Sequence, residues 1–221
     1  MKRRFLKEFF RTFILAGLSL LLSQFAFAQT TSPMSDNDID IFLETLSSRA
    51  LSVNTISAGF RQEKKMDMLK NNMLSEGRFY YMKENKIAFL YEKPGKYSMI
   101  MNGQYLKMNT GYGSSKMDLS SNPVMKQMND LLTAVFTGSL DRATASYDIS
   151  FTYLGEEVVA SVKPRSSRIS AVISLIKIQF EKGSGDINEI IVTEGSGSTT
   201  KYIFFDRRIN QQIANEIFTI N

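Results

Sequence analysis

The first regular pattern of apolar and polar positions along the chain is helical. After a polar spacer from Gln29 to Met34, apolar side chains recur every three or four residues, at Ile39, Phe42, Leu43, Leu46 and Ala50. This spacing places them on one face of an α-helix. Ser35 and Asp38 have the spacing of a capping box. We therefore predict an amphipathic helix that begins at Ser35.

From Thr55 to Leu119 the period changes to two, which is typical of β-strands. Phe79 and Tyr81, for example, alternate with Tyr80 and Met82. Turn-forming residues interrupt the alternation at short intervals, and the Asn102-Gly103 pair is the strongest hairpin signal among them. Short strands separated by tight turns predict an antiparallel meander.

A second helix is predicted after this meander. Asn122 is a favourable cap and Pro123 suits the first helical position, while Gly138 can end the helix. The apolar stripe between them consists of Met125, Met128, Leu132, Val135 and Phe136. Alternating segments resume near Ser146, and the segment 164–168 is predicted to hold a short helical turn. The later strands are expected around residues 149–153, 158–162, 176–181, 187–193 and 199–205, followed by an apolar ending at 217–220.

These elements predict an α+β fold with about eleven strands and two or three helices. The helices interrupt runs of strands and do not follow each strand, which favours a single large antiparallel sheet. A sheet of this size twists and curls, so we expect a half-barrel whose concave face is covered by the helices as a lid.

The first 28 residues have the features of a cleavable signal peptide. Five basic residues precede a short apolar stretch that ends in Ala26-Phe27-Ala28. We therefore expect a secreted protein with one domain over residues 29–221. The whole chain has a net charge of +5, but residues 29–221 contain 22 bases and 21 acids. The near-neutral balance argues against nucleic-acid binding through a basic surface.

The composition excludes most kinds of catalytic and metal-binding site. The chain has no Cys and no His, so Ser-His-Asp and Cys-His catalysis and most zinc sites are excluded. The neighbouring Glu156 and Glu157 would point to opposite faces of a strand, and Arg207-Arg208 is expected at a solvated edge. We expect no enzyme activity, no metal and no cofactor.

Several motifs, in order, resemble the LolA family of periplasmic lipoprotein carriers. Segment 56–62 (ISAGFRQ) is similar to the family's early Phe-x-Gln strand, and segment 76–81 (EGRFYY) resembles its Gly-x-aromatic strand. Tyr91 to Pro94, the 102–106 hairpin, Val162 to Pro164, Asn210 and Phe218 continue the similarity. One departure is that Lys83-Glu84 stands where the best-known members have Arg-Pro, and Ile87 stands where they have an aromatic residue.

The resemblance implies a monomeric carrier of lipoprotein acyl chains. Such a carrier takes its cargo from an inner-membrane release complex and passes it to an outer-membrane acceptor. Lys83 and Ile87 then belong to a segment expected to contact cargo or partners. The departure there leaves open a carrier of another lipid or of a hydrophobic metabolite.

A lipid carrier needs an adaptable apolar lining, and Met reshapes around irregular surfaces easily. Eleven of residues 29–221 are Met. The same aromatic and Met positions also fit an ordinary packed core. The candidate lining of cavity and lid is Phe60, Phe79, Tyr81, Phe89, Tyr91, Met99, Met101, Met108, Ile176, Ile178 and Phe180 on the strands, with Leu43, Leu46, Met128, Leu132 and Phe136 on the helices.

Two other classes of function compete with a carrier. A sensing module would use the same curved sheet to detect mislocalised lipoproteins, and a periplasmic hydrolase would use paired carboxylates. The sequence offers no candidate carboxylate pair, so the order of preference is carrier, sensor, enzyme.

Overall fold

The computed structural model describes residues 31–66, 72–136 and 138–220. The described part forms one compact unit that begins at Thr31. The signal peptide predicted at residues 1–28 lies outside the described residues. Within the described part, no helix combines the length and apolar character that a membrane span requires.

The structure contains one antiparallel sheet of twelve strands, which is not closed into a barrel, together with a few helices. The strands are β1 (Thr31–Pro33), β2 (Thr55–Lys65), β3 (Met73–Met82), β4 (Lys86–Lys93), β5 (Tyr97–Asn102), β6 (Tyr105–Thr110), β7 (Gly113–Asp118), β8 (Tyr147–Leu154), β9 (Glu157–Pro164), β10 (Ile173–Glu181), β11 (Ile187–Glu194) and β12 (Thr199–Ile209). The helices are α2 (Asp36–Ser52), α3 (Pro123–Phe136), α4 (Leu140–Ala143), α5 (Ser167–Ser170) and the 3-10 turns η1 (Leu119–Ser121) and η2 (Asn215–Phe218).

The predicted curved sheet with a helical lid is confirmed, with one strand more than expected. That strand, β1, lies in the segment predicted to be a polar spacer. It pairs with β8 over three residues, from Thr31 opposite Leu154 to Pro33 opposite Thr152. Both predicted helix starts are also confirmed. The Ser35 hydroxyl accepts a hydrogen bond from the Asp38 amide, and the Asn122 side chain accepts from the amides of Val124 and Met125.

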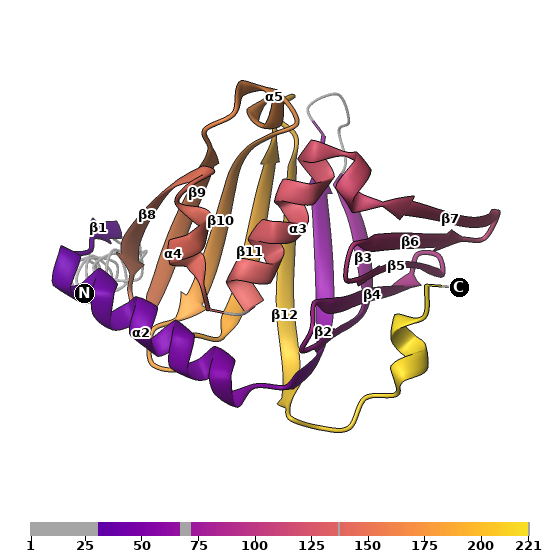
Figure 1. Cartoon of the computed structure of the whole chain (residues 1–221), viewed down its shortest axis with the longest axis horizontal. Coiled ribbons are helices and arrows are strands. Elements are labelled where there is room, and N and C mark those ends of the chain that lie inside the picture. The colour runs from indigo at the N-terminus through magenta and orange to yellow at the C-terminus, as the bar shows by residue number, and fades with distance from the viewer. Residues whose placement is uncertain (1–30, 67–71, 137, 221) are drawn as a thin grey trace, which may run out of the picture. The chain divides into compact units, whose positions relative to one another are not determined.

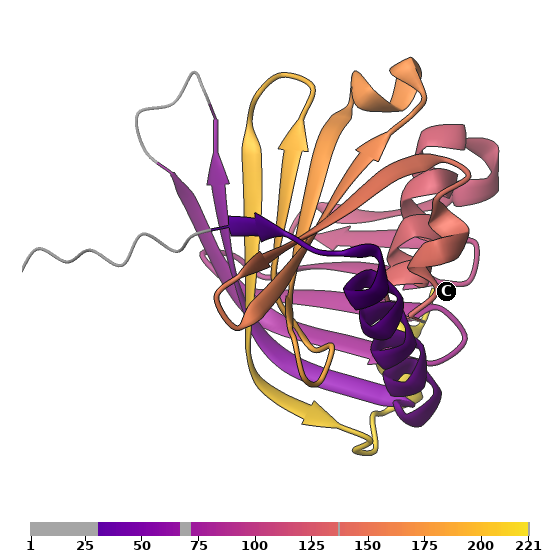
Figure 2. The ribbon, with the colours of Figure 1, turned by 90° about the vertical axis from the view of Figure 1, so that its left-hand side faces the viewer.

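The strand order across the sheet is β1-β8-β9-β10-β11-β12-β2-β3-β4-β5-β6-β7. Strands β2 to β7 form the predicted meander, which ends at the β7 edge. The chain then crosses to β8, near the opposite edge, through the segment that contains α3. Figures 1 and 2 show α3 in front of the middle of the sheet and α2 across one end of the same, concave, face.

The strand register collects the apolar side chains of the concave face into rows. Phe79, Phe89, Met99 and Met108 lie opposite one another across β3, β4, β5 and β6. On the other half of the sheet, Ile178 of β10 lies between Ala160 and Ile190. Because neighbours in a row are in contact across the strands, these rows build one continuous apolar surface.

The end of the chain covers part of the opposite, convex face. Phe218 of η2 is buried against Ala88 of β4 and Ile100 of β5. The Asn102 side-chain amide donates a hydrogen bond of 3.0 Å to the Phe218 carbonyl oxygen. The apolar ending at 217–220 therefore contributes to a small second core behind the sheet.

Asn210 fastens the junction between α2 and β2. Its side-chain oxygen accepts a 2.7 Å hydrogen bond from the Asn54 amide, and its side-chain nitrogen donates a 2.8 Å bond to the Ser52 carbonyl. Its backbone φ is 57°, a left-handed conformation that Asn adopts more readily than most residues. Asn210 therefore satisfies the backbone where α2 ends.

We expect Asn210→Ala to lower the free energy of unfolding by about 1–2 kcal/mol, because two hydrogen bonds are lost and Ala is strained at positive φ. Asn210→Gly should lose less, since Gly accepts this conformation. Urea unfolding of the three proteins measures the difference. Equal losses in both variants would show that backbone strain makes no contribution here.

Candidate functional site

Helix α2 is held on the concave face by an aromatic cluster. The Phe42 ring packs edge-on against Phe180 of β10 and Phe151 of β8, with ring centroids 5.5 and 6.0 Å apart. Leu46, one turn later, is also buried, and Ile39 and Leu43 are partly buried against the same core. The stripe predicted for this helix is therefore its inner face.

Helix α3 places its last turn over the middle of the sheet. The Phe136 ring stacks on Phe79, with centroids 5.4 Å apart, and on Tyr81, with centroids 5.1 Å apart. Leu131 and Val135 are buried beside it, whereas Leu132 is partly buried. The Phe136 ring therefore fills the middle of the concave face, and we call it the aromatic plug.

The turn after α3 contacts α2 closely, and a glycine makes this possible. Gly138 has φ 62°, and a Cβ at this position would lie 2.3 Å from the Leu46 carbonyl oxygen. The Ser47 hydroxyl donates a 3.2 Å hydrogen bond to the Gly138 carbonyl. The turn after α3 thus packs against the backbone of α2 and is held there by a side-chain-to-backbone hydrogen bond.

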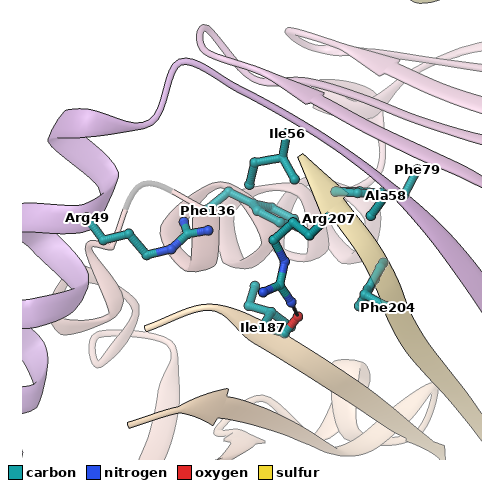
Figure 3. A pocket seen from close by; sticks show the side chains of 8 residues that line it. All are labelled: Arg49, Ile56, Ala58, Phe79, Phe136, Ile187, Phe204 and Arg207. Carbon is teal, nitrogen blue, oxygen red and sulfur yellow. Dashed lines mark hydrogen bonds between the residues drawn. The ribbon is translucent and has the colours of Figure 1, made fainter. Parts of the chain in front are cut away.

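Among the residues that the structure describes, side chains of α2, α3 and the central strands pack closely on the concave face. A void of about 20 Å³ remains between α2, α3 and the sheet (Figure 3), enough for roughly one water molecule. An acyl chain can therefore enter this void only if α3 or the side chains beneath it move. The void is lined by Arg49, Ile56, Ala58, Phe79, Phe136, Ile187, Phe204 and Arg207.

A larger and more open cleft of about 780 Å³ lies where the end of α2 meets α3 and the end of β3. Tyr147 lies on its wall and donates a 3.1 Å hydrogen bond to the Gln127 carbonyl. Burial, with a smaller contribution from the negative charge of Asp130, raises the pKa of Tyr147 to about 12. The cleft also borders Ser47, Ala50, Leu51, Tyr81, Lys83, Glu84, Leu131, Thr133, Ala134, Ser139, Ala143 and Ser146.

Most of the predicted lining lies together in the concave core. Phe79 and Phe136 border the void and Tyr81 borders the cleft. The remaining buried members are Leu46, Phe60, Phe89, Tyr91, Met101, Ile176, Ile178 and Phe180, and the partly buried members packed against them are Leu43, Met99, Met128 and Leu132.

Met108 is the one predicted lining residue that the core does not include. The register places it on the concave face beside Met99, but it lies on β6, beyond the helices, and 42% of it is exposed. Met117 of β7 lies on the same face of the sheet and is exposed to a similar degree. The apolar face therefore extends past the lid to the β7 edge.

The two residues of the predicted partner segment, Lys83 and Ile87, lie in different environments. Ile87 is 3% exposed, packed in the concave core, and is therefore out of reach of a partner in this closed structure. The Lys83 side-chain ammonium donates a 2.9 Å hydrogen bond to the Leu51 carbonyl. The backbone amide of Lys83 donates a hydrogen bond to the Asn54 carbonyl. Lys83 thus ties the end of β3 to the end of α2.

The aromatic side chains of the concave face include two tyrosines, Tyr91 and Tyr202. The Tyr91 ring stacks on Tyr97, and its hydroxyl donates a 2.6 Å hydrogen bond to the Gln62 side chain. Burial raises the pKa of Tyr91. Burial also raises the pKa of Tyr202, whose ring lies beside Phe60. These phenols remain neutral in the apolar face at physiological pH.

An ionic cluster beside the void was missed by the sequence analysis. Asp186 lies between Arg49 of α2 and Arg207 of β12. The prediction that Arg207 lies at a solvated edge is wrong. A bulge between Phe205 and Arg208, with Asp206 at φ 50°, shifts the alternation by one residue and turns Arg207 to the concave side. No local residue pattern signals this bulge.

An open, curved antiparallel sheet whose apolar inner face is closed by amphipathic helices defines a protein of the half-barrel class with a helical lid. This chain belongs to the LolA family, because the family model described as outer membrane lipoprotein carrier protein LolA matches residues 51–221. The family fold supports, in general terms, a module that binds or carries lipoproteins or lipids. Curated protein sequences include no significant match.

Solved structures with similar folds have little sequence identity to this chain. A LolA superfamily protein from Nitrosomonas europaea is 10% identical over 80% of this chain and 97% of its own, with a TM-score of 0.42. The Mycobacterium tuberculosis lipoprotein LppX is 11% identical over 81% and 99%, with a TM-score of 0.45. Pseudomonas aeruginosa MucB, in complex with MucA, is 13% identical over 84% and 60%, with a TM-score of 0.47.

Proposed function

We propose that this protein is a periplasmic carrier that shields lipoprotein acyl chains between the concave sheet and its helical lid. In this proposal it is exported by the signal peptide at residues 1–28, acts as a monomer without catalysis, and moves its cargo from an inner-membrane release complex to an outer-membrane acceptor. The observation that carries the proposal is the continuous apolar inner face, roofed by two amphipathic helices.

The free energy of hydrating an acyl chain favours a carrier that encloses the chain in an apolar face. Each buried methylene contributes ~0.8 kcal/mol, so a sixteen-carbon chain represents roughly 12 kcal/mol of avoided hydration. A carrier must offset most of this and still release the chain. An apolar face whose side chains also contact one another meets both needs, because aromatic contacts such as Phe136 on Tyr81 can replace contacts with the cargo.

A LolA-like carrier of another lipid is the second candidate. It is favoured by the residue at position 83. Lys83 keeps a positive charge but lacks the planar fork of Arg, and its ammonium is engaged with the Leu51 carbonyl. A module that senses lipoproteins without transporting them would use the same apolar face.

Native mass spectrometry of the secreted protein, purified without detergent, tests the proposal. We expect either a co-purifying acylated polypeptide or the uptake of one triacylated lipopeptide per protein. A co-purifying lipid without a polypeptide would favour the second candidate. A clean apo mass with no later uptake would contradict the carrier proposal and leave an ordinary packed core.

A further inference from the structure

Two guanidinium groups share one carboxylate at the inner side of α2. Arg49 donates from Nε and Nη2 to Asp186 Oδ1, and the Nε distance is 2.6 Å. Arg207 Nη1 lies 2.8 Å from Asp186 Oδ2. Arg207 Nη2 also donates to the Ile187 carbonyl and contacts the Asn188 side-chain oxygen at 3.4 Å. The side chains of these three charged residues are only 14–17% exposed.

Among the described residues, the ion pairs that join Arg49, Asp186 and Arg207 leave a net charge of +1 on these three groups. Two Arg and one Asp sum to +1, and the neighbouring partners of Arg207, a backbone carbonyl and an amide oxygen, are neutral. A charge withdrawn from water is unfavourable unless an opposite charge compensates it. A purely structural link between α2 and the sheet would need only one Arg for one Asp.

This charge borders the apolar interior. Arg49 and Arg207 line the same void as Phe79, Phe136 and Phe204. Figure 3 shows the Arg49 guanidinium directed from α2 toward that of Arg207, with Phe136 behind them. Burial raises the pKa of Tyr81 within the lining, and the nearby positive charge of Arg49 opposes this effect. A ligand head beside the two Arg side chains would therefore have its apolar tail beside the aromatic plug.

We propose that Arg49 and Arg207 bind the anionic head group, a carboxylate or a phosphate, of an amphiphile whose acyl chain enters the concave core. Arg suits both anions because its planar donors engage two oxygens at once. Asp186 holds the two guanidiniums in place when the site is empty. This assignment names the ligand class of the proposed carrier site and therefore rests on the proposed function.

The test compares ligands that share a twelve-carbon chain and differ in their head group, which is anionic in two of them and neutral in the third. Dodecanoate, dodecyl phosphate and neutral 1-dodecanol compete with diphenylhexatriene for the full chain, purified without detergent. We expect at least one anion to bind about tenfold more tightly than the alcohol at low salt, with the advantage decreasing as salt screens the charge. The comparison of dodecanoate with dodecyl phosphate distinguishes a fatty acid from a lipid phosphate.

Three variants separate this role from a structural one. Arg207→Met should remove most of the preference for the anion and leave alcohol binding unchanged, whereas Arg208→Met, at an exposed neighbouring position, should change neither. Asp186→Asn raises the local charge to +2, so anion affinity should increase even if thermal stability decreases. A purely structural link predicts the opposite sign for Asp186→Asn.

The possible failures are distinguishable. Tight binding of the alcohol with no preference for either anion would overturn this inference and leave the carrier proposal standing. Weaker anion binding by Asp186→Asn would also overturn it, whether or not Arg207→Met folds. Failure of all three amphiphiles to displace the probe would remove both this inference and the carrier proposal.

Discussion

Replacing Phe136 with alanine should lower the free energy of unfolding by about 3–5 kcal/mol without reducing lipid uptake. The ring is buried and stacks on Phe79 and Tyr81, so its removal enlarges the void of about 20 Å³. An acyl chain can occupy the space that the ring leaves. Urea unfolding and binding of a triacylated lipopeptide, measured on the same preparation, test the two effects.

The control for this variant is Phe205→Ala. Phe205 lies on the convex face against Gly59 and is substantially exposed, so its removal should cost less stability and leave uptake unchanged. A loss of uptake in Phe136→Ala that parallels its loss of stability would contradict the plug interpretation, because the concave face would then be a core with no second occupant.

The second large effect is expected at Phe42. Phe42→Ala should also cost about 3–5 kcal/mol, since the ring is buried between Phe151 and Phe180. Its removal should loosen α2 from the sheet before the sheet itself unfolds. Hydrogen exchange would detect this as faster exchange in residues 36–52 than in β9 and β10.

Ile41→Ala provides the matched comparison, because Ile41 is the neighbouring residue on α2 and lies exposed. It should change stability by less than about 0.5 kcal/mol. Uniform acceleration of exchange across helix and sheet in Phe42→Ala would mean that α2 and the sheet unfold as one unit, and that the lid does not open by itself.

Local signals predicted most of the architecture correctly. Ser35 and Asn122 cap their helices as expected, because capping depends on residues within one turn. The Asn102-Gly103 turn joins β5 to β6, with Gly103 at φ 59°. The LolA family was also identified correctly from short motifs in their order along the chain. The caps, the turn and each single motif share one property, since each is determined over a few neighbouring residues.

Features that depend on distant partners could not be predicted in the same way. Strand β1 contains only three residues, and its pairing with β8 joins segments about 120 positions apart. Arg207 turns inward because of a bulge that the alternation of side chains does not reveal. Periodicity also places Met108 and Phe89 on one face without indicating that Phe89 is buried and Met108 exposed.

The crossover between β7 and β8 has a mechanical consequence. Strand β7 is one edge of the sheet and β8 pairs with β1 at the other, so the described parts of the crossover, 119–136 and 138–146, run in front of the concave face (Figure 1). The length of this segment is fixed by its covalent chain. Any flattening of the sheet must therefore stretch or displace α3, so that sheet curvature and helix position form one coupled coordinate.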